Sequence, residues 1–182
     1  MTTRHIKCDP LRAEIETALR FGDFIRYDAM FAFTDELDQV ERKLQALVTG
    51  GEAERALALY EVFLAGCYEK IEEGDDSSGD LGMFWDSLFR GWVLARQAAG
   101  CRADETVRLI LKWKATDQYG FCYDIEKEVA SILDAEGYAL LVAQMQRSLQ
   151  DKEATAQGAT ADKFSEPVIA AQIASAALKE VY

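Results

Sequence analysis

Proline occurs at only two positions in this chain of 182 residues, Pro10 and Pro167. It interrupts helices more reliably than any other residue, because it has no backbone N–H and its ring clashes with the preceding turn. The residues between these two positions are therefore free to be helical. Asp9 can cap a helix that starts with Pro10 in its first turn, and Pro167 stands where a last helix should begin.

Apolar residues recur at helical spacing through most of this proline-free region. After the short helix at Pro10, spacings of three and four predict helices over residues 29–48, 52–73, 80–99, 104–115, 123–135 and 138–149. The turn at Gly50 and Gly51 is so short that the first two long helices should form an antiparallel hairpin. No window alternates polar and apolar residues with period two, so we predict no sheet.

The segment 80–99 is apolar around much of its circumference. Its large apolar residues are Leu81, Phe84, Trp85, Leu88, Phe89, Trp92 and Val93, together with Ala95. A helix with this pattern is usually buried between neighbours on more than one side. We expect it to be the central element of the fold, and we expect the aromatic residues of this helix, with Trp113 and Tyr119, to be core rather than the lining of a ligand groove.

The helix pairs that start near Asp35, Asp80 and Asp124 are about 45 residues apart, within the range of HEAT repeats and longer than the tetratricopeptide period. We predict an all-α fold of stacked antiparallel helix pairs, a fragment of a HEAT-like or tetratricopeptide-like solenoid, with a globular helical bundle as the alternative. The predicted domain covers residues 1–149. A mobile linker over 150–165 and a C-terminal helix over 166–182 should follow, because residues 150–165 are polar and have no apolar stripe.

The chain is acidic, with 32 Asp and Glu against 20 Lys and Arg and a formal net charge of -12. Such a surface repels phosphate backbones and anionic lipid headgroups, and no stretch approaches the roughly 20 apolar residues of a membrane span. The four cysteines include no C-x-x-C pair and are expected to be reduced. These features predict a cytoplasmic protein that binds neither nucleic acid nor membranes.

Motifs of common enzymes are missing from the sequence. The single histidine, His5, would have to serve any catalytic triad or multi-histidine metal site. Neither the glycine-rich nucleotide-binding loops nor the nucleophile elbow of hydrolases occurs. We therefore predict no cofactor and assign no catalytic residues.

An acidic loop separates the helices predicted at 52–73 and 80–99. Its carboxylates form the candidate metal or partner site, which consists of Glu69, Glu72, Glu73, Asp75, Asp76 and Asp80. The loop does not fit an EF-hand, because Leu81 stands where glycine is required and Ser87 where glutamate is required. It does not fit all-α pyrophosphohydrolases either, because the second E-x-x-D half of their metal site is absent.

A capped turn explains the loop better than a metal site does. Gly74 can end the first helix, and Ser77 or Ser78 can cap the next. Glu72 and Glu73 would then lie at the negative end of a helix dipole. We expect a cation such as Lys70 or Arg90, or a binding partner, to lie near them.

Residues 75–82, with the sequence DDSSGDLG, resemble a D-D-S-D-G-x-x-G loop in a family of uncharacterised bacterial helical-repeat proteins. Members of this family often also carry a SWIM-type zinc finger. Residues 24–27, 56–60 and 95–99 add to the similarity. The resemblance implies a helical-repeat fold and no established catalytic residues. Ser78 replaces an acidic residue of the family loop, Trp92 stands where members often have histidine, and the chain has no zinc-finger pattern.

Together these features predict a non-catalytic scaffold that mediates binding to another protein. The alternative is an all-α enzyme that uses the carboxylates of residues 69–80 to hold a divalent metal ion.

Overall fold

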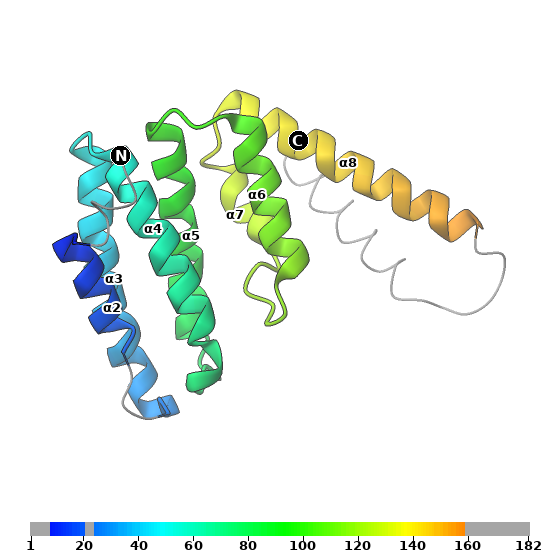
Figure 1. Ribbon diagram of the computed structural model, residues 1–182. Helices are drawn as coiled ribbons and strands as arrows, with labels where there is room; N and C mark the ends of the chain where they lie inside the picture. Colours follow the sequence, from blue (N-terminus) through cyan, green and yellow to red (C-terminus); the bar gives the residue numbers. More distant parts are fainter. Residues whose placement is uncertain (1–7, 21–23, 159–182) are drawn as a thin grey trace. The chain divides into compact units, whose positions relative to one another are not determined.

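The computed structural model describes residues 8–20 and 24–158, and regular secondary structure within them is helical (Figure 1). The elements are α2 (Pro10–Ala18), α3 (Tyr27–Thr49), α4 (Ala53–Glu69), the 3-10 helix η1 (Ile71–Glu73), α5 (Asp80–Ala98), α6 (Ala103–Thr116), α7 (Ile125–Ala130) and α8 (Ala135–Gly158). The predicted all-α class is confirmed. The predicted helix at 166–182 and the linker residues 159–165 lie outside the described residues. Among the residues that the structure describes, no helix is both long and apolar enough to cross a membrane.

The chain divides into two compact units, residues 1–134 and residues 135–182. The first unit contains α2 to α7, and the second contains α8. The predicted domain ended at residue 149 and the predicted linker began at Gln150, whereas α8 continues through this position to Gly158. Residues 150–157 are mostly Ala, Gln, Glu, Lys and other residues that a helix tolerates, so the helix persists after its apolar pattern fades.

Helix boundaries in the second half of the chain also differ from the prediction. The helix predicted at 123–135 is the short α7, which ends at Ala130, and the predicted break at Gly137 lies inside α8. The backbone N–H groups of Ile132 and Leu133 bond back to Val129 at 3.0 Å and close the last turn of α7. A single glycine inside a helix costs only about 1 kcal/mol, which does not end it.

The N-terminal cap of α2 forms as predicted. The Asp9 carboxylate accepts a hydrogen bond of 2.9 Å from the Leu11 N–H, and Pro10 occupies the first helical position. Asp9 also accepts bonds of 2.7 and 3.0 Å from the Arg55 guanidinium on α4. This hydrogen bonding from Arg55 lowers the pKa of the Asp9 carboxyl and ties α2 to α4.

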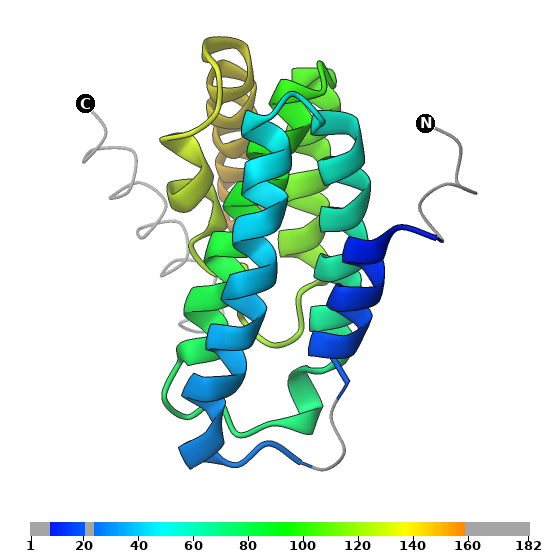
Figure 2. The ribbon, with the colours of Figure 1, turned by 90° about the vertical axis from the view of Figure 1, so that its left-hand side faces the viewer.

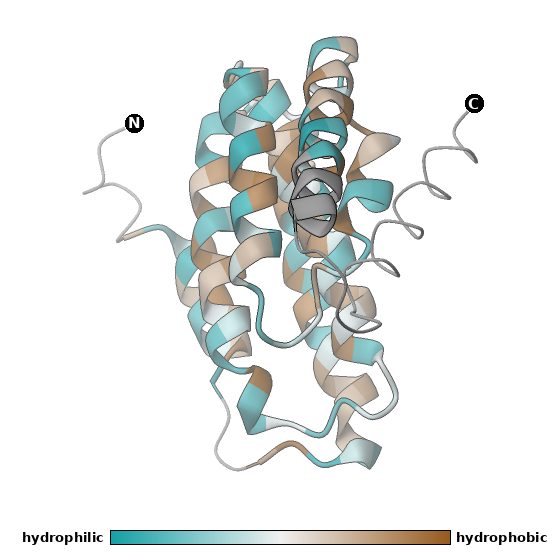
Figure 3. Cartoon of the chain, turned by 90° about the vertical axis from the view of Figure 1, so that its right-hand side faces the viewer, coloured by the Kyte–Doolittle hydropathy of each residue, from teal (hydrophilic) through white to brown (hydrophobic). Residues whose placement is uncertain are grey.

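Helices α3 and α4 form the predicted antiparallel hairpin, joined at Gly50 and Gly51. Gly51 has a φ of 84°, in the left-handed region that glycine reaches without steric cost. Figure 2 shows that α3 and α5 begin at the same end of this unit, where the segment between α4 and α5 also lies. Hydrophilic and hydrophobic residues alternate along the helices, as expected for amphipathic elements (Figure 3).

Helix α5 is the central element of the first unit, as predicted. It packs against α3, α4, α6 and α7. All eight residues named from its apolar pattern are buried, and Trp85, Leu88 and Phe89 are fully so. Gly91 allows α4 to approach closely, because a Cβ atom there would lie only 2.4 Å from the Tyr60 hydroxyl oxygen.

One buried carboxyl group lies beside this close approach. Glu41 on α3 is only 2% exposed and accepts a hydrogen bond of 2.8 Å from the Tyr60 hydroxyl. The Gln45 amide donates to the two carboxylate oxygens at 2.9 and 2.7 Å. Burial raises the pKa of the Glu41 carboxyl, and these hydrogen bonds oppose the rise.

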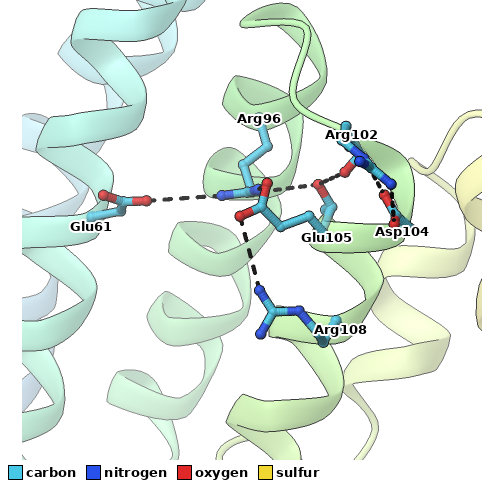
Figure 4. A network of polar contacts seen from close by, with 7 residues as sticks. Glu61, Arg96, Arg102, Asp104, Glu105 and Arg108 are labelled. Carbon is cyan, nitrogen blue, oxygen red and sulfur yellow. Dashed lines mark hydrogen bonds and ion pairs between the residues drawn. The ribbon is translucent and has the colours of Figure 1, made fainter.

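A buried arginine in the last turn of α5 connects three helices. Arg96 on α5 is 4% exposed, and its Nε donates to the Thr106 hydroxyl of α6 at 2.9 Å. Its terminal nitrogens lie 3.9 Å from a Glu61 oxygen on α4 and 3.5 Å from a Glu105 oxygen on α6 (Figure 4). The guanidinium also lies over the Trp92 ring, 5.3 Å from its centre. The charge is therefore compensated from several directions, as a buried cation requires.

The Tyr60–Gly91 contact predicts that Gly91→Ala destabilises the protein. The new methyl would overlap the oxygen and two ring carbons of the fully buried Tyr60, all within 2.7 Å. We expect a loss of about 1–3 kcal/mol in the free energy of unfolding, measured by urea denaturation. Gly82→Ala is the matched control in the same helix, because its Cβ would have no neighbour closer than 3.8 Å. Equal stability of the two variants would contradict the prediction.

Candidate functional site

The acidic loop is held to the segment before α3 by backbone hydrogen bonds. The Ile25 N–H donates to the Glu73 carbonyl and the Asp75 N–H donates to the Ile25 carbonyl, both at 2.8 Å. These bonds form an isolated parallel bridge between Ile25 and Gly74. Gly74 fits closely against α3, because a Cβ there would lie 2.7 Å from the Met30 methyl. The loop and residues 24–27 therefore lie side by side, although they are far apart in the sequence.

Asp76 caps α5, where Ser77 or Ser78 was expected to do so. Its two carboxylate oxygens accept hydrogen bonds from the N–H groups of Leu81 at 2.8 Å and Gly82 at 3.1 Å. A turn from Asp76 to Gly79 brings residue 76 to the helix end, and Gly79 adopts a φ of 80° to allow it. The two serines bond to Asp75 and Asp80 instead. The cap was missed because this turn is not visible in the spacing of residues.

Glu72 and Glu73 accept hydrogen bonds from side chains of the first unit. Lys70 donates to both oxygens of Glu73, at 2.7 and 2.9 Å, as expected, and the Tyr119 hydroxyl donates to Glu72 at 2.7 Å. Arg90, the other expected cation, instead donates to the Glu128 carbonyl at 3.0 Å. Helix α4 ends at Glu69, and the two glutamates lie in the short η1, so Glu69, Glu72 and Glu73 do not share one continuous α-helix.

The carboxylates of the candidate site hold the loop together by their hydrogen bonds. Glu69 is exposed on the last turn of α4. Protein donors reach each of the others, which are Glu72, Glu73, Asp75, Asp76 and Asp80. In the part of the chain that the structure describes, no three Asp, Glu, His or Cys side chains are grouped so as to hold a metal ion.

A surface that the sequence analysis did not identify lies beside the loop. Phe24, Tyr27 and Phe31 are 58%, 58% and 71% exposed. Tyr27 and Phe31, four residues apart, share one side of the start of α3, and Phe24, in the segment just before the helix, lies near Tyr27. We call these three residues the aromatic face. The buried Ile25 and Met30 alternate with them and anchor the same segment to the core. The signal was available in the sequence, because none of the three rings belongs to the apolar stripe of the helix predicted at 29–48, which consists of Phe33, Leu37, Val40, Leu44 and Leu47.

An open hollow of about 410 Å³ borders the aromatic face. Phe24 and Tyr27 supply its apolar lining, and Arg26, Asp28 and Asp75 supply its charges. The Arg26 Nε lies 3.7 Å from an Asp28 oxygen, with both side chains largely exposed. An exposed pair of this kind contributes little to stability. Arg26 and Asp28 are therefore open to a ligand, while Asp75 is half-buried and accepts bonds from Ser77.

The aromatic residues of α5 are core, as predicted, whereas Trp113 packs against them and is half-buried. Trp85 lies 5.6 Å from Trp113 and 5.8 Å from Phe121 between ring centres, and Phe89 lies 5.1 Å from Trp92. Tyr119 differs from the prediction, since it is 42% exposed at the edge of the cluster.

The cysteines provide no reactive thiol in the core. All four are free, as predicted. Burial raises the pKa of the Cys67 and Cys122 thiols to about 12, so both are protonated at neutral pH.

Asp86 on α5 is a carboxyl group in an unfavourable environment. Burial, followed by the nearby charges of Glu128 and Asp124, raises its pKa to about 6. Arg90, one turn further along α5, lies 3.8 Å from a Glu128 oxygen and only partly offsets this negative charge. The negative charge of Asp86 on α5 is therefore repelled by those of Asp124 and Glu128 in and beside α7.

No protein-family model, curated protein or solved structure matches this chain. The resemblance of residues 75–82 to a helical-repeat family therefore stays a prediction.

The cap at Asp76 predicts that Asp76→Ala destabilises the protein by about 0.5–2 kcal/mol, because two N–H groups of α5 lose their acceptor. Ser78→Ala is the control in the same loop, since it removes only one exposed bond to Asp80. Urea denaturation of the two variants measures the difference. A loss for Ser78→Ala as large as that for Asp76→Ala would show that the serine is the cap.

The raised pKa of Asp86 predicts a pH-dependent stability. The folded state binds the proton of the Asp86 carboxyl more tightly than the unfolded chain does. The stabilisation that comes from this protonation is complete below about pH 3.8 and is lost as the pH rises through about 6. The free energy of unfolding of Asp86→Asn should therefore exceed that of the wild type by roughly 1 kcal/mol at pH 7.5, after allowance for screening by solvent. The gain should shrink as the pH falls below 6. Denaturation curves at several pH values measure it, with Asp35→Asn at an exposed position of α3 as the control. A gain for Asp86→Asn that does not change with pH would contradict the prediction.

Proposed function

We propose that this chain is a non-catalytic scaffold of stacked helix pairs that binds another protein through the aromatic face. The observation that supports the proposal is the exposure of Phe24, Tyr27 and Phe31, each more than half open to solvent within eight residues at the start of α3. Contiguous exposed rings are characteristic of interaction surfaces, and aromatic residues are enriched at the centres of protein interfaces.

The rigid support of the aromatic face favours binding. Ile25 is fixed by two hydrogen bonds to the loop, and Met30 is 1% exposed beneath the start of α3. A binding surface whose backbone is already ordered loses little conformational entropy when a partner docks. The acidic loop thus contributes to the proposed function by holding the aromatic face in place.

An estimate of the binding energy shows what the rings can supply. Covering the exposed parts of three aromatic side chains removes on the order of 300 Å² of apolar surface from water, which is about 7 kcal/mol at 25 cal/mol per Å². Association itself costs roughly 4–15 kcal/mol. The rings alone therefore give weak binding, and the charged groups around the hollow must contribute to a stable complex.

The docking proposal predicts a photo-crosslink from position 31. With p-benzoylphenylalanine in place of Phe31, the protein should form one defined covalent adduct in the cells that make it. The same probe in place of Leu94 is the control, because Leu94 is 43% exposed and lies about 20 Å further along α5 from the loop end. The partner, identified by mass spectrometry and purified, should bind at least tenfold more weakly to Phe24→Ser/Phe31→Ser, and equally well to Leu94→Ser.

Two results would contradict this function. One is an adduct that forms equally at both positions, and the other is a purified partner whose affinity does not change in the double variant. Melting curves with and without Mg²⁺, Mn²⁺ or Ca²⁺ address the metal-dependent alternative. A ligand at a hundred times its Kd stabilises a protein by about 2.7 kcal/mol, so a clear rise in Tm would favour that alternative.

A further inference from the structure

We infer that the partner segment received by the aromatic face and the hollow is cationic, a stretch of protein that carries arginine or lysine. This inference rests on the proposed function and specifies the chemistry of the partner. In the bound state, the cationic groups lie against the exposed rings and reach the carboxylates of Asp28 and Asp75.

The charges that line the hollow favour a cation. Two of its three charged residues are carboxylates, and Asp28 and Asp75 stand on different segments with Phe24 and Tyr27 in the same lining. The third, Arg26, lies 3.7 Å from Asp28 and competes for it from an exposed position. A cationic side chain that enters the hollow can therefore pair with Asp75 directly and displace Arg26 from Asp28.

The charged residues of the two segments around the hollow, residues 24–36 and 69–80, are also mostly acidic. In residues 24–36 and 69–80, Arg26 and Lys70 are the basic residues. The acidic residues of these two segments are Asp28, Asp35, Glu36, Glu69, Glu72, Glu73, Asp75, Asp76 and Asp80. The field of such a surface attracts cations and accelerates their association.

The aromatic rings add a second source of attraction for the same ligand. The faces of phenylalanine and tyrosine rings carry negative potential and attract guanidinium and ammonium groups. This protein already contains such a contact, between the Arg96 guanidinium and the Trp92 ring at 5.3 Å. Arginine in particular can stack on a ring and bond to a carboxylate at once, because its guanidinium is planar and carries several donors.

Other occupants fit less well. Phosphate groups of nucleic acids and anionic headgroups are repelled by Asp28, Asp75 and the neighbouring carboxylates. A second copy of this chain, related by a twofold axis at the hollow, would place the same carboxylates opposite each other. An acidic or purely apolar peptide would bring no cation to the two carboxylates of the hollow.

Selection of peptides from a random phage-displayed library on the full chain tests this inference. We expect the selected peptides to be enriched in arginine and lysine compared with the unselected library. A synthetic copy of a selected peptide should bind at least tenfold more weakly to Asp28→Asn/Asp75→Asn, and more weakly in 500 mM than in 50 mM NaCl. Asparagine at position 75 keeps an oxygen for the bond from Ser77, so the loop should stay intact.

Two further variants sharpen the test. Arg26→Gln should bind the same peptide about two- to fivefold more tightly, because the internal competitor for Asp28 is gone. Asp35→Asn/Glu36→Gln is the matched control, since it removes two charges from the same helix outside the lining of the hollow. A loss in this control as large as that in Asp28→Asn/Asp75→Asn would overturn the inference, because the general field would then be responsible.

The remaining outcomes separate this inference from the proposed function. The selected peptides could lack cationic enrichment and still bind more weakly to Phe24→Ser/Phe31→Ser. This result would overturn the inference of a cationic segment, but it would not contradict docking at the aromatic face. Peptides that bind independently of both rings would overturn the inference and count against the proposed function. A library that yields no peptide above background would overturn the inference, and the crosslink from position 31 would then decide the function separately.

Discussion

The burial of α5 by four other helices is the constraint on which the rest of the first unit depends. A fully buried large apolar side chain contributes roughly 1.5–3 kcal/mol, and α5 buries seven of them together with Ala95. This gain requires helices on several sides, so α3, α4, α6 and α7 all pack on it. The close approach of Tyr60 to Gly91 then fixes the position of α4 along α5. Because α5 is fixed, its N-terminus and the loop before it are fixed as well.

Polar groups inside the unit determine how the helices align. Glu41, 2% exposed, needs the hydroxyl of Tyr60 and the amide of Gln45, and Arg96, 4% exposed, needs Thr106 and two glutamates. Moving charges out of water is costly, and their pairing often only offsets that cost. A shifted helix would leave one of these groups without a partner. We therefore attribute to them the choice of one helix arrangement rather than a large part of the stability.

Helix periodicity explains which parts of the fold could be predicted from the sequence. The apolar stripes gave α3, α4, α5 and α6 with boundaries mostly close to those observed, because local spacing decides which residues share a helix face. The Asp76 cap and the burial of Arg96 depend on a loop turn and on helices packed from elsewhere in the chain, so spacing does not reveal them. The aromatic face was missed for a different reason. Phe24, Tyr27 and Phe31 lie outside the apolar stripe that enters the core, and the stripe predicts only which residues a helix buries.

The acidic loop links the fold to the proposed binding chemistry. At the sequence level, Glu72 and Glu73 suggested a partner, but Tyr119 and Lys70 satisfy them within the chain. Asp76 is committed to the cap of α5. Asp75, whose Oδ1 accepts bonds from Ser77, joins the bridge to Ile25 through its backbone, and its half-buried side chain lines the hollow beside Phe24 and Tyr27. The bridge that orders the aromatic segment therefore also brings a carboxylate to its edge, so rigid rings and negative charge arise from the same contact. That combination favours a cationic partner over a purely apolar one.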